Sequence, residues 1–441
     1  MKKRISLLAA ALVTALLFTG CALRTVDQMY TPPKRSEEYD HLQSAIDMVM
    51  YSLEYCAPIS GEHQQTVQMA DLNGDGVEEY LVFAKGTSEK PLHILIFDRD
   101  EEGKAQIMEI IESNGSAFEQ VEYVNMDAKP GCELVVGRQV SDQVQRSVSV
   151  YSFSDGDARQ ILSTGYSRFL TSDLNADGRQ ELMVIQPGEG ETDKGQVFLY
   201  SFRQGQMERS VEVSLSQKVN NIKRIMTSRL QDGNPAVYIA SAVEEDAILT
   251  DILALRDGRF TNISYSSESG TGVKTLRNYY VYGDDVDNDG ILELPDLITM
   301  QPLYWDWNIE MQYLIRWYAV DSQGREVDKM HTFHNYAGGW YVQLDSAWAD
   351  RANVEQEDSV YCFYAWDEDQ ADAQILFRIY TFTGSDRENQ ASSDGRFALY
   401  RSEGVVYAAS LEEAGAALGI TPETLTNSFH LIHQDWKTGE T

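Results

Sequence analysis

The chain has 441 residues, 43% of them hydrophobic, and 69 acidic residues stand against 36 basic ones, for a formal net charge of −33. Affinity for a phosphate backbone comes from Lys and Arg side chains, so this balance argues against nucleic-acid binding. The same charge would repel an anionic membrane surface. Only three cysteines follow Cys21, and a sparse, odd set argues against a disulfide framework.

The first 21 residues, "MKKRISLLAAALVTALLFTGC", combine a basic start, an apolar run and small residues before a cysteine, which is typical of a secretion signal. The segment resembles a bacterial lipoprotein signal. The resemblance implies that 1–20 is removed, that Cys21 carries a diacylglycerol, and that the protein is tethered to the outer face of the cytoplasmic membrane. A plain secretory signal is the alternative. No later apolar run reaches the roughly 18 residues that a spanning helix needs, so the lipid is the only expected membrane contact.

Residues 21–36, with two adjacent prolines, are expected to form a tether, and residues 37–61 an N-terminal helical segment. Leu42, Ile46, Val49 and Leu53 recur at helical spacing and predict one apolar face. We expect this face to pack against the first of the repeats that follow.

An acidic nine-residue pattern, D-x-[ND]-x-D-G-x-x-E, occurs at 71–79, 173–181 and 285–293, each time before an apolar run in a strand-rich context. Weaker copies occupy 125–133 and 228–236. The five starts are 54, 48, 55 and 57 residues apart, so the chain has an internal repeat of roughly fifty residues.

The spacing suggests a calcium loop, because oxygens at positions 1, 3 and 5, a carbonyl at 7 and a turn-forming glycine at 6 can wrap the ion. An EF-hand would need an acid at position 12, where Val82 and Val184 stand in the first two intact copies. The glutamate at position 9 closes the loop instead. Ordinary turns rich in Asp, Asn and Gly are the alternative, which the threefold recurrence disfavours.

The weaker copies lack a complete ligand set. In 125–133, Lys129 takes the fifth position, where its ammonium could replace the charge of an ion; this loop is expected to close by a salt bridge without metal. In 228–236, Ser228, Leu230 and Ala236 stand where ligands belong.

The loops resemble those of FG-GAP or VCBS repeat proteins, including the blades of integrin α-subunit propellers. The whole chain also resembles uncharacterised, repeat-bearing lipoproteins of Firmicutes type. The resemblance implies a β-propeller in which each loop joins two strands of a blade and about three calcium ions hold the loops rigid. It assigns metal-ligand roles to Asp71, Asn73, Asp75, Val77 and Glu79, to Asp173, Asn175, Asp177, Arg179 and Glu181, and to Asp285, Asp287, Asp289, Ile291 and Glu293, with Val77, Arg179 and Ile291 offering main-chain carbonyls.

Four short strands per repeat predict a mainly β fold, with a propeller of about five four-stranded antiparallel blades over 62–333. From 334 to 441 the strands lack acidic loops and are followed by an expected helix that starts at Thr421 and turns Leu425, Phe429, Ile432 and Trp436 to one side. This part is expected to be a separate α+β domain, and it distantly resembles the PsbP-like fold.

The sequence contains no serine elbow, H-E-x-x-H motif or glycine-rich phosphate loop. We therefore expect a non-catalytic ligand-binding or scaffolding module at the cell surface, with an unidentified protein or glycan as partner. The alternative is an accessory cell-wall or glycan-processing hydrolase built on a carboxylate pair.

In the aromatic stretch 302–318 packing is the favoured role, and Trp305 and Trp307 are the candidates to face a ligand.

Overall fold

The computed structural model describes residues 37–432, except 101–102, 141–145, 155, 189–192, 245–246, 267, 270, 278–280, 301, 303–310 and 367–371. The expected signal, tether and lipidation site, and Trp305, Trp307 and Trp436, lie outside the described residues. The described part is mainly β, with six antiparallel sheets that follow one another along the chain.

The first four sheets are meanders in which consecutive strands pair, as in a propeller blade, except that β1 pairs with β3 in the first sheet. The first contains β1 (Glu54–Tyr55), β2 (Val67–Ala70), β3 (Glu79–Lys85), β4 (Leu92–Arg99) and β5 (Ala105–Ser113). The second contains β6 (Ala117–Val124), β7 (Glu133–Gln139), β8 (Arg146–Ser152) and β9 (Arg159–Tyr166). The third contains β10 (Arg168–Ser172), β11 (Glu181–Pro187), β12 (Gly195–Arg203) and β13 (Gln206–Ser214), and the fourth β14 (Ile222–Arg229), β15 (Pro235–Glu244), β16 (Ala247–Arg256) and β17 (Arg259–Asn262).

The fifth sheet contains β18 (Leu294–Thr299), β19 (Tyr313–Val320), β20 (Glu326–Asn335), β21 (Trp340–Leu344) and β27 (Phe429–Leu431). The sixth contains β22 (Ala352–Glu357), β23 (Val360–Ala365), β24 (Gln374–Thr383), β25 (Phe397–Ser402) and β26 (Val405–Leu411), accompanied by α4 (Arg387–Ser392), α5 (Glu413–Ala417) and α6 (Pro422–Ser428). Residue 334, the expected domain boundary, lies inside β20, and β27 returns from the C-terminal part to pair with β21. The fifth sheet therefore continues across that position.

Both expected helices are shorter than their apolar patterns suggest. The first, α3 (Glu37–Val49), gives way to a 3-10 turn, and β1 then pairs with the end of β3. Its predicted face is confirmed, because Leu42 and Ile46 pack against the first sheet. The second expected helix ends at Ser428, because Phe429 begins β27, where pairing with β21 replaces the helical hydrogen bonds.

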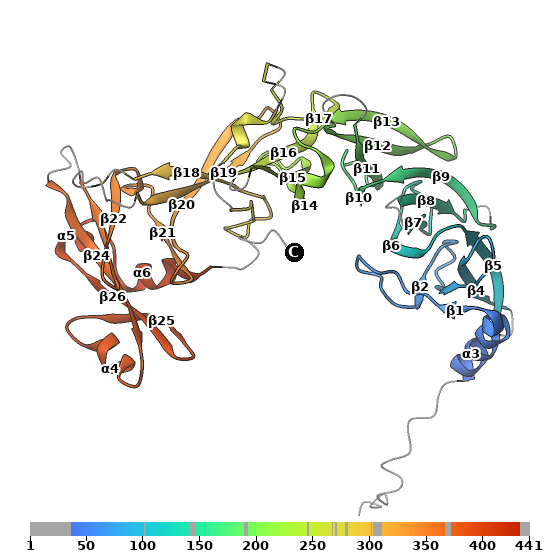
Figure 1. Cartoon of the computed structure of the whole chain (residues 1–441), viewed down its shortest axis with the longest axis horizontal. Helices are drawn as coiled ribbons and strands as arrows, with labels where there is room; N and C mark the ends of the chain where they lie inside the picture. The colour runs from blue at the N-terminus through green and yellow to red at the C-terminus, as the bar shows by residue number, and fades with distance from the viewer. Residues whose placement is uncertain are drawn as a thin grey trace, which may run out of the picture.

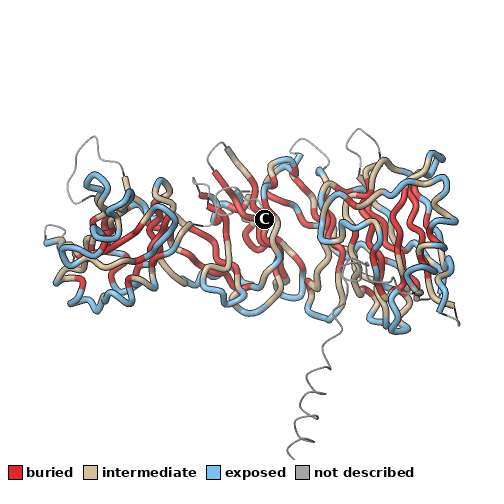
Figure 2. The backbone as a smooth tube through the Cα atoms, turned by 90° about the horizontal axis from the view of Figure 1, so that it is seen from below, coloured by how far each residue is buried: buried red, intermediate tan, exposed pale blue. Residues whose placement is uncertain are grey.

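Consecutive sheets bury their faces against each other. In β11, Leu182 and Val184 pack toward the second sheet, whereas Met183 and Ile185 pack toward the fourth. The same alternation recurs from sheet to sheet, so the central strands are buried on both faces and read as continuous apolar runs in the sequence. Figure 2 shows these buried strands along the whole length of the molecule.

The sheets follow an open arch in Figure 1, with the first and sixth at opposite ends. At one end α3 covers the outer face of the first sheet, which carries Val82 and Leu95. At the other, Ala391 of α4 packs on Val406 and Ala408 on the outer face of the sixth sheet. A closed five-bladed ring would need the outer face of the first sheet to contact the fifth sheet, but α3 covers that face. The succession of blades is propeller-like, while the expected closure into a five-bladed ring is not seen.

Candidate metal centres

All five loops lie at the start of a sheet. Loops 71–79, 125–133, 173–181 and 228–236 each connect the first long strand of a sheet to the next strand, and 285–293 leads into β18 through a bridge between Asp284 and Glu293. The intact copies at 71–79, 173–181 and 285–293 are here termed the first, third and fifth loops, and the weaker copies the second and fourth.

The three intact loops share one backbone conformation. The position-6 glycine has φ of +86°, +86° and +83°, a left-handed conformation that favours glycine. Its N–H donates to the position-1 aspartate, which fixes that carboxylate at the centre of the loop. The donor–acceptor pairs are Gly76 to Asp71 (3.0 Å), Gly178 to Asp173 (2.9 Å) and Gly290 to Asp285 (2.9 Å).

The closing glutamates are buried and hydrogen-bonded to the backbone of their own loops. Glu79, Glu181 and Glu293 are at most 2% exposed, and each accepts the N–H of the position-2 residue at 2.7, 2.9 and 3.0 Å respectively. Burial, together with the charges of neighbouring loop aspartates, raises the pKa of each of these carboxyls to about 7. A cation among these carboxylates would oppose both effects.

The fifth loop fits a hard cation best. Asp285, Asp287 and Asp289 each place a carboxylate oxygen within 4.8 Å of the others. Glu293 Oε1 is buried without a hydrogen-bond partner in the described structure. In the first and third loops the position-3 residue is asparagine, whose Nδ2 donates to that glutamate oxygen at 2.8 and 2.6 Å; Asp287 has no N–H to donate. An all-oxygen donor set with an unsatisfied carboxylate suits calcium.

Basic side chains already neutralise two of the three position-5 aspartates. Arg179 Nη2 lies 2.5 Å from Asp177 Oδ2, and Lys329 Nζ, from β20, lies 2.6 Å from Asp289 Oδ2. The sequence pattern did not reveal Lys329, because forty residues separate it from its partner. Any ion in the fifth loop would share Asp289 with this ammonium.

The weaker loops behave as their sequences suggest. Lys129 Nζ lies 3.5 Å from Asp127 Oδ2, so the predicted ion pair is confirmed, and Glu133 still closes the second loop by accepting the N–H of Met126 at 2.8 Å. In the fourth loop Ala236 replaces the closing acid, and Gly233 N–H donates to the carbonyl of Leu230 as in an ordinary turn.

Replacing Lys329 with Met is expected to raise calcium affinity at the fifth loop about two- to fivefold, because it removes the partly buried ion pair in which Lys329 competes for Asp289. Calcium titration by calorimetry would measure the change. Lys218→Met is the matched control, because Lys218 is an exposed lysine paired with Asp193 outside the loops. If both variants gained calcium affinity equally, the change in net charge alone would explain the gain, and the Lys329–Asp289 pair would have no specific effect.

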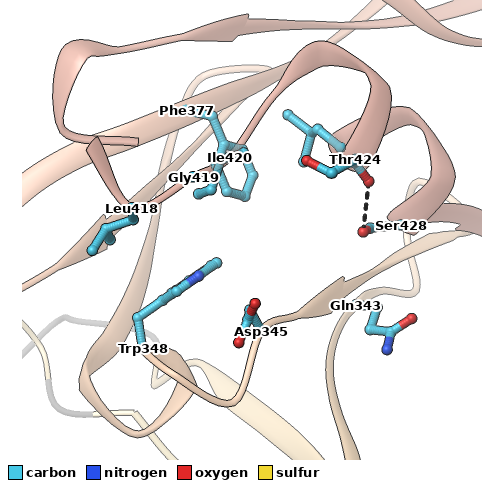
Figure 3. Close-up of a pocket in the computed structure, with 10 residues that line it drawn as sticks. Gln343, Asp345, Trp348, Phe377, Leu418, Gly419, Ile420, Thr424 and Ser428 are labelled. Carbon is cyan, nitrogen blue, oxygen red and sulfur yellow. Dashed lines mark hydrogen bonds between the residues drawn. The ribbon is translucent and has the colours of Figure 1, made fainter. Parts of the chain in front are cut away.

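Among the described residues, two cavities of more than about 100 Å³ lie outside the loops. The larger, about 400 Å³, lies beside β19, β20 and β23, where the fifth and sixth sheets meet; its lining includes Tyr313, Phe333, Tyr336, Tyr361, Gln312 and Gln356. The smaller, about 120 Å³, is shown in Figure 3, with Trp348 and Phe377 facing the polar side chains of Asp345 and Thr424. Only the larger reaches the volume usual for ligand sites.

No protein-family model matches the chain, and no curated protein matches it. Solved structures with similarity include the rhamnogalacturonan lyase YesW, at 12% identity over 73% of this chain and 72% of that chain, with a TM-score of 0.31. A rhamnogalacturonan lyase from Bacillus licheniformis has 12% identity over the same shares and a TM-score of 0.29. The Dos1 propeller has 8% identity over 80% of this chain and 68% of that chain, with a TM-score of 0.31.

Among the described residues, no helix has both the length and the apolar character to cross a membrane.

Proposed function

We propose that this chain is a calcium-stabilised extracytoplasmic lipoprotein of the FG-GAP/VCBS repeat type, which binds a ligand or scaffolds a partner at the cell surface. The recurring loops and their shared backbone conformation support the repeat type. Calcium has a structural role in this proposal: each intact loop gathers three or four carboxylates, and one divalent ion would cancel most of their mutual repulsion.

The cavity of about 400 Å³ between the fifth and sixth sheets is the observation that carries the binding role. Its described lining combines aromatic and aliphatic side chains with amides and His334, and includes no carboxylate, lysine or arginine, a composition that suits a neutral ligand such as a sugar or a peptide segment. A glycosidase would need two convergent carboxylates, and the described lining residues include none. Binding is therefore favoured over hydrolysis.

A glycan array and a pull-down with the chain starting at residue 22 test this proposal. Tyr313→Ala removes a ring that lines the cavity and is 44% exposed, and should abolish capture of the ligand. Tyr400→Ala removes a comparably exposed ring, 42%, from β25, and should leave capture unchanged. Equal capture by both variants would exclude the cavity as the binding site, and release of a cleaved sugar would favour the hydrolase.

The lipid anchor is a separate prediction. Cys21→Ala removes the sulfur that would carry the diacylglycerol, and is expected to shift the protein from the membrane fraction to the soluble fraction. Cell fractionation with immunoblotting measures this. Cys56→Ala is the control and should stay with the membrane. Lipidation would be contradicted if the processed Cys21 variant stayed with the membrane to the same extent as the parent.

A further inference from the structure

Two arginines are buried at the junction of the fourth and fifth sheets. Arg224, on β14, is 7% exposed, and its Nε and Nη1 have no hydrogen-bond partner in the described structure. Arg277 is 5% exposed; its Nε donates to the carbonyl of Val281 at 2.7 Å and its Nη1 to Thr250 Oγ1 at 3.1 Å, but its Nη2 has no partner. Burial lowers the pKa of Arg277 to about 10, so it still carries its charge at neutral pH.

A small cavity adjoins this pair. Its volume is about 10 Å³, roughly that of one water-sized occupant, and is too small for phosphate or sulfate. Arg224 and Thr250 line it together with Tyr238, Tyr282 and apolar side chains, and none of its described lining residues is acidic. Arg277 reaches the cavity wall through its hydrogen bond to Thr250.

A buried guanidinium without a counter-ion strongly disfavours the folded state. Water in the cavity could accept the free N–H groups of Arg224 but would leave its charge uncompensated. A monatomic anion would accept these N–H groups and also compensate the charge, because it can accept several donors from any direction and carries the opposite charge.

We propose that this cavity binds one monatomic anion, with chloride as the physiological ligand, held by Arg224 and flanked by Arg277 across Thr250. The site is independent of the calcium loops and of the cavity between the fifth and sixth sheets. It would neutralise positive charge inside a chain whose overall charge is strongly negative.

Thermal melts of the full chain at constant ionic strength and fixed calcium test the site, with sodium chloride or bromide compared with sodium methanesulfonate, whose anion is too large for the cavity. A saturable rise in Tm of about 2 °C or more is expected in the halides, because only the folded state offers the site. Equal melting temperatures in all three salts would overturn the proposal in favour of bound water.

Arg224→Met keeps a side chain of similar length but removes the charge, and should abolish the halide dependence. Lys223→Met, the control, removes the same charge from an exposed neighbour and should retain it. Halide dependence that persists in Arg224→Met would overturn the assignment. If Arg224→Met does not fold, crystals of the parent grown in bromide test the anion site instead. An anomalous peak within hydrogen-bonding distance of Arg224 is expected. Density without anomalous signal would contradict the site.

Discussion

Excess EDTA is expected to lower the melting temperature of the protein markedly relative to millimolar calcium. An ion bound only by the folded state stabilises it by about 2.7 kcal/mol per site when its concentration is one hundred times the dissociation constant. Three loops bring carboxylates together, and in the fifth the buried Oε1 of Glu293 has no hydrogen-bond partner in the described structure. The loss of several ions at once should therefore exceed the effect of most single substitutions.

The matched control is the triple variant Asp75→Ala, Asp177→Ala and Asp289→Ala, which removes one carboxylate from each intact loop. Its melting temperature should be the same with EDTA and with calcium. Identical midpoints for the parent in the two conditions would show that the loops are ordinary turns, and a full EDTA effect in the triple variant would place the ions elsewhere.

Trp340→Ala is expected to destabilise the protein by about 3–5 kcal/mol, the range for truncating a buried tryptophan. Trp340 is fully buried where the fifth and sixth sheets meet. Its ring lies 5.2 Å from that of Tyr361 on β23 and 5.5 Å from that of Phe429 on β27, measured between centroids. The side chain thus joins three elements that are distant in the sequence. Urea denaturation followed by circular dichroism would measure the loss.

Trp340→Phe separates packing from hydrogen bonding. The indole Nε1 is buried without a partner in the described structure, so phenylalanine loses volume but no hydrogen bond. We expect a much smaller loss than for alanine. A change below about 1 kcal/mol in the alanine variant would show that the fifth and sixth sheets do not share a tightly packed core.

The loops and the individual strands could be predicted from the sequence because their signals are local. Asp71, Asp75 and Glu79 lie within nine residues, and the turn between them depends on Gly76. The strands of the meanders pair with their neighbours in the chain, so alternating and continuous apolar runs were sufficient to locate them.

Contacts between distant segments could not be predicted in the same way. The pairing of Phe429 with Val342 converts the end of an apparently amphipathic helix into β27, and nothing in the local pattern indicates this partner. The position of α3 is also determined by distant contacts. Its apolar face could be predicted from the sequence, but its contact with the surface that a closed ring would need could not. The ion pair between Lys329 and Asp289 is likewise not predictable from the local pattern, because forty residues separate its partners.

Calorimetric titration with calcium of the parent and four single variants tests the central claim most directly. The parent is expected to bind about three ions, in line with its three intact loops. Asp75→Ala, Asp177→Ala and Asp289→Ala should each lose one, whereas Asp127→Ala, in the loop where Lys129 already pairs with that carboxylate, should lose none. A parent that binds no calcium, or an Asp127 variant that loses a site while the other three keep theirs, would contradict the account.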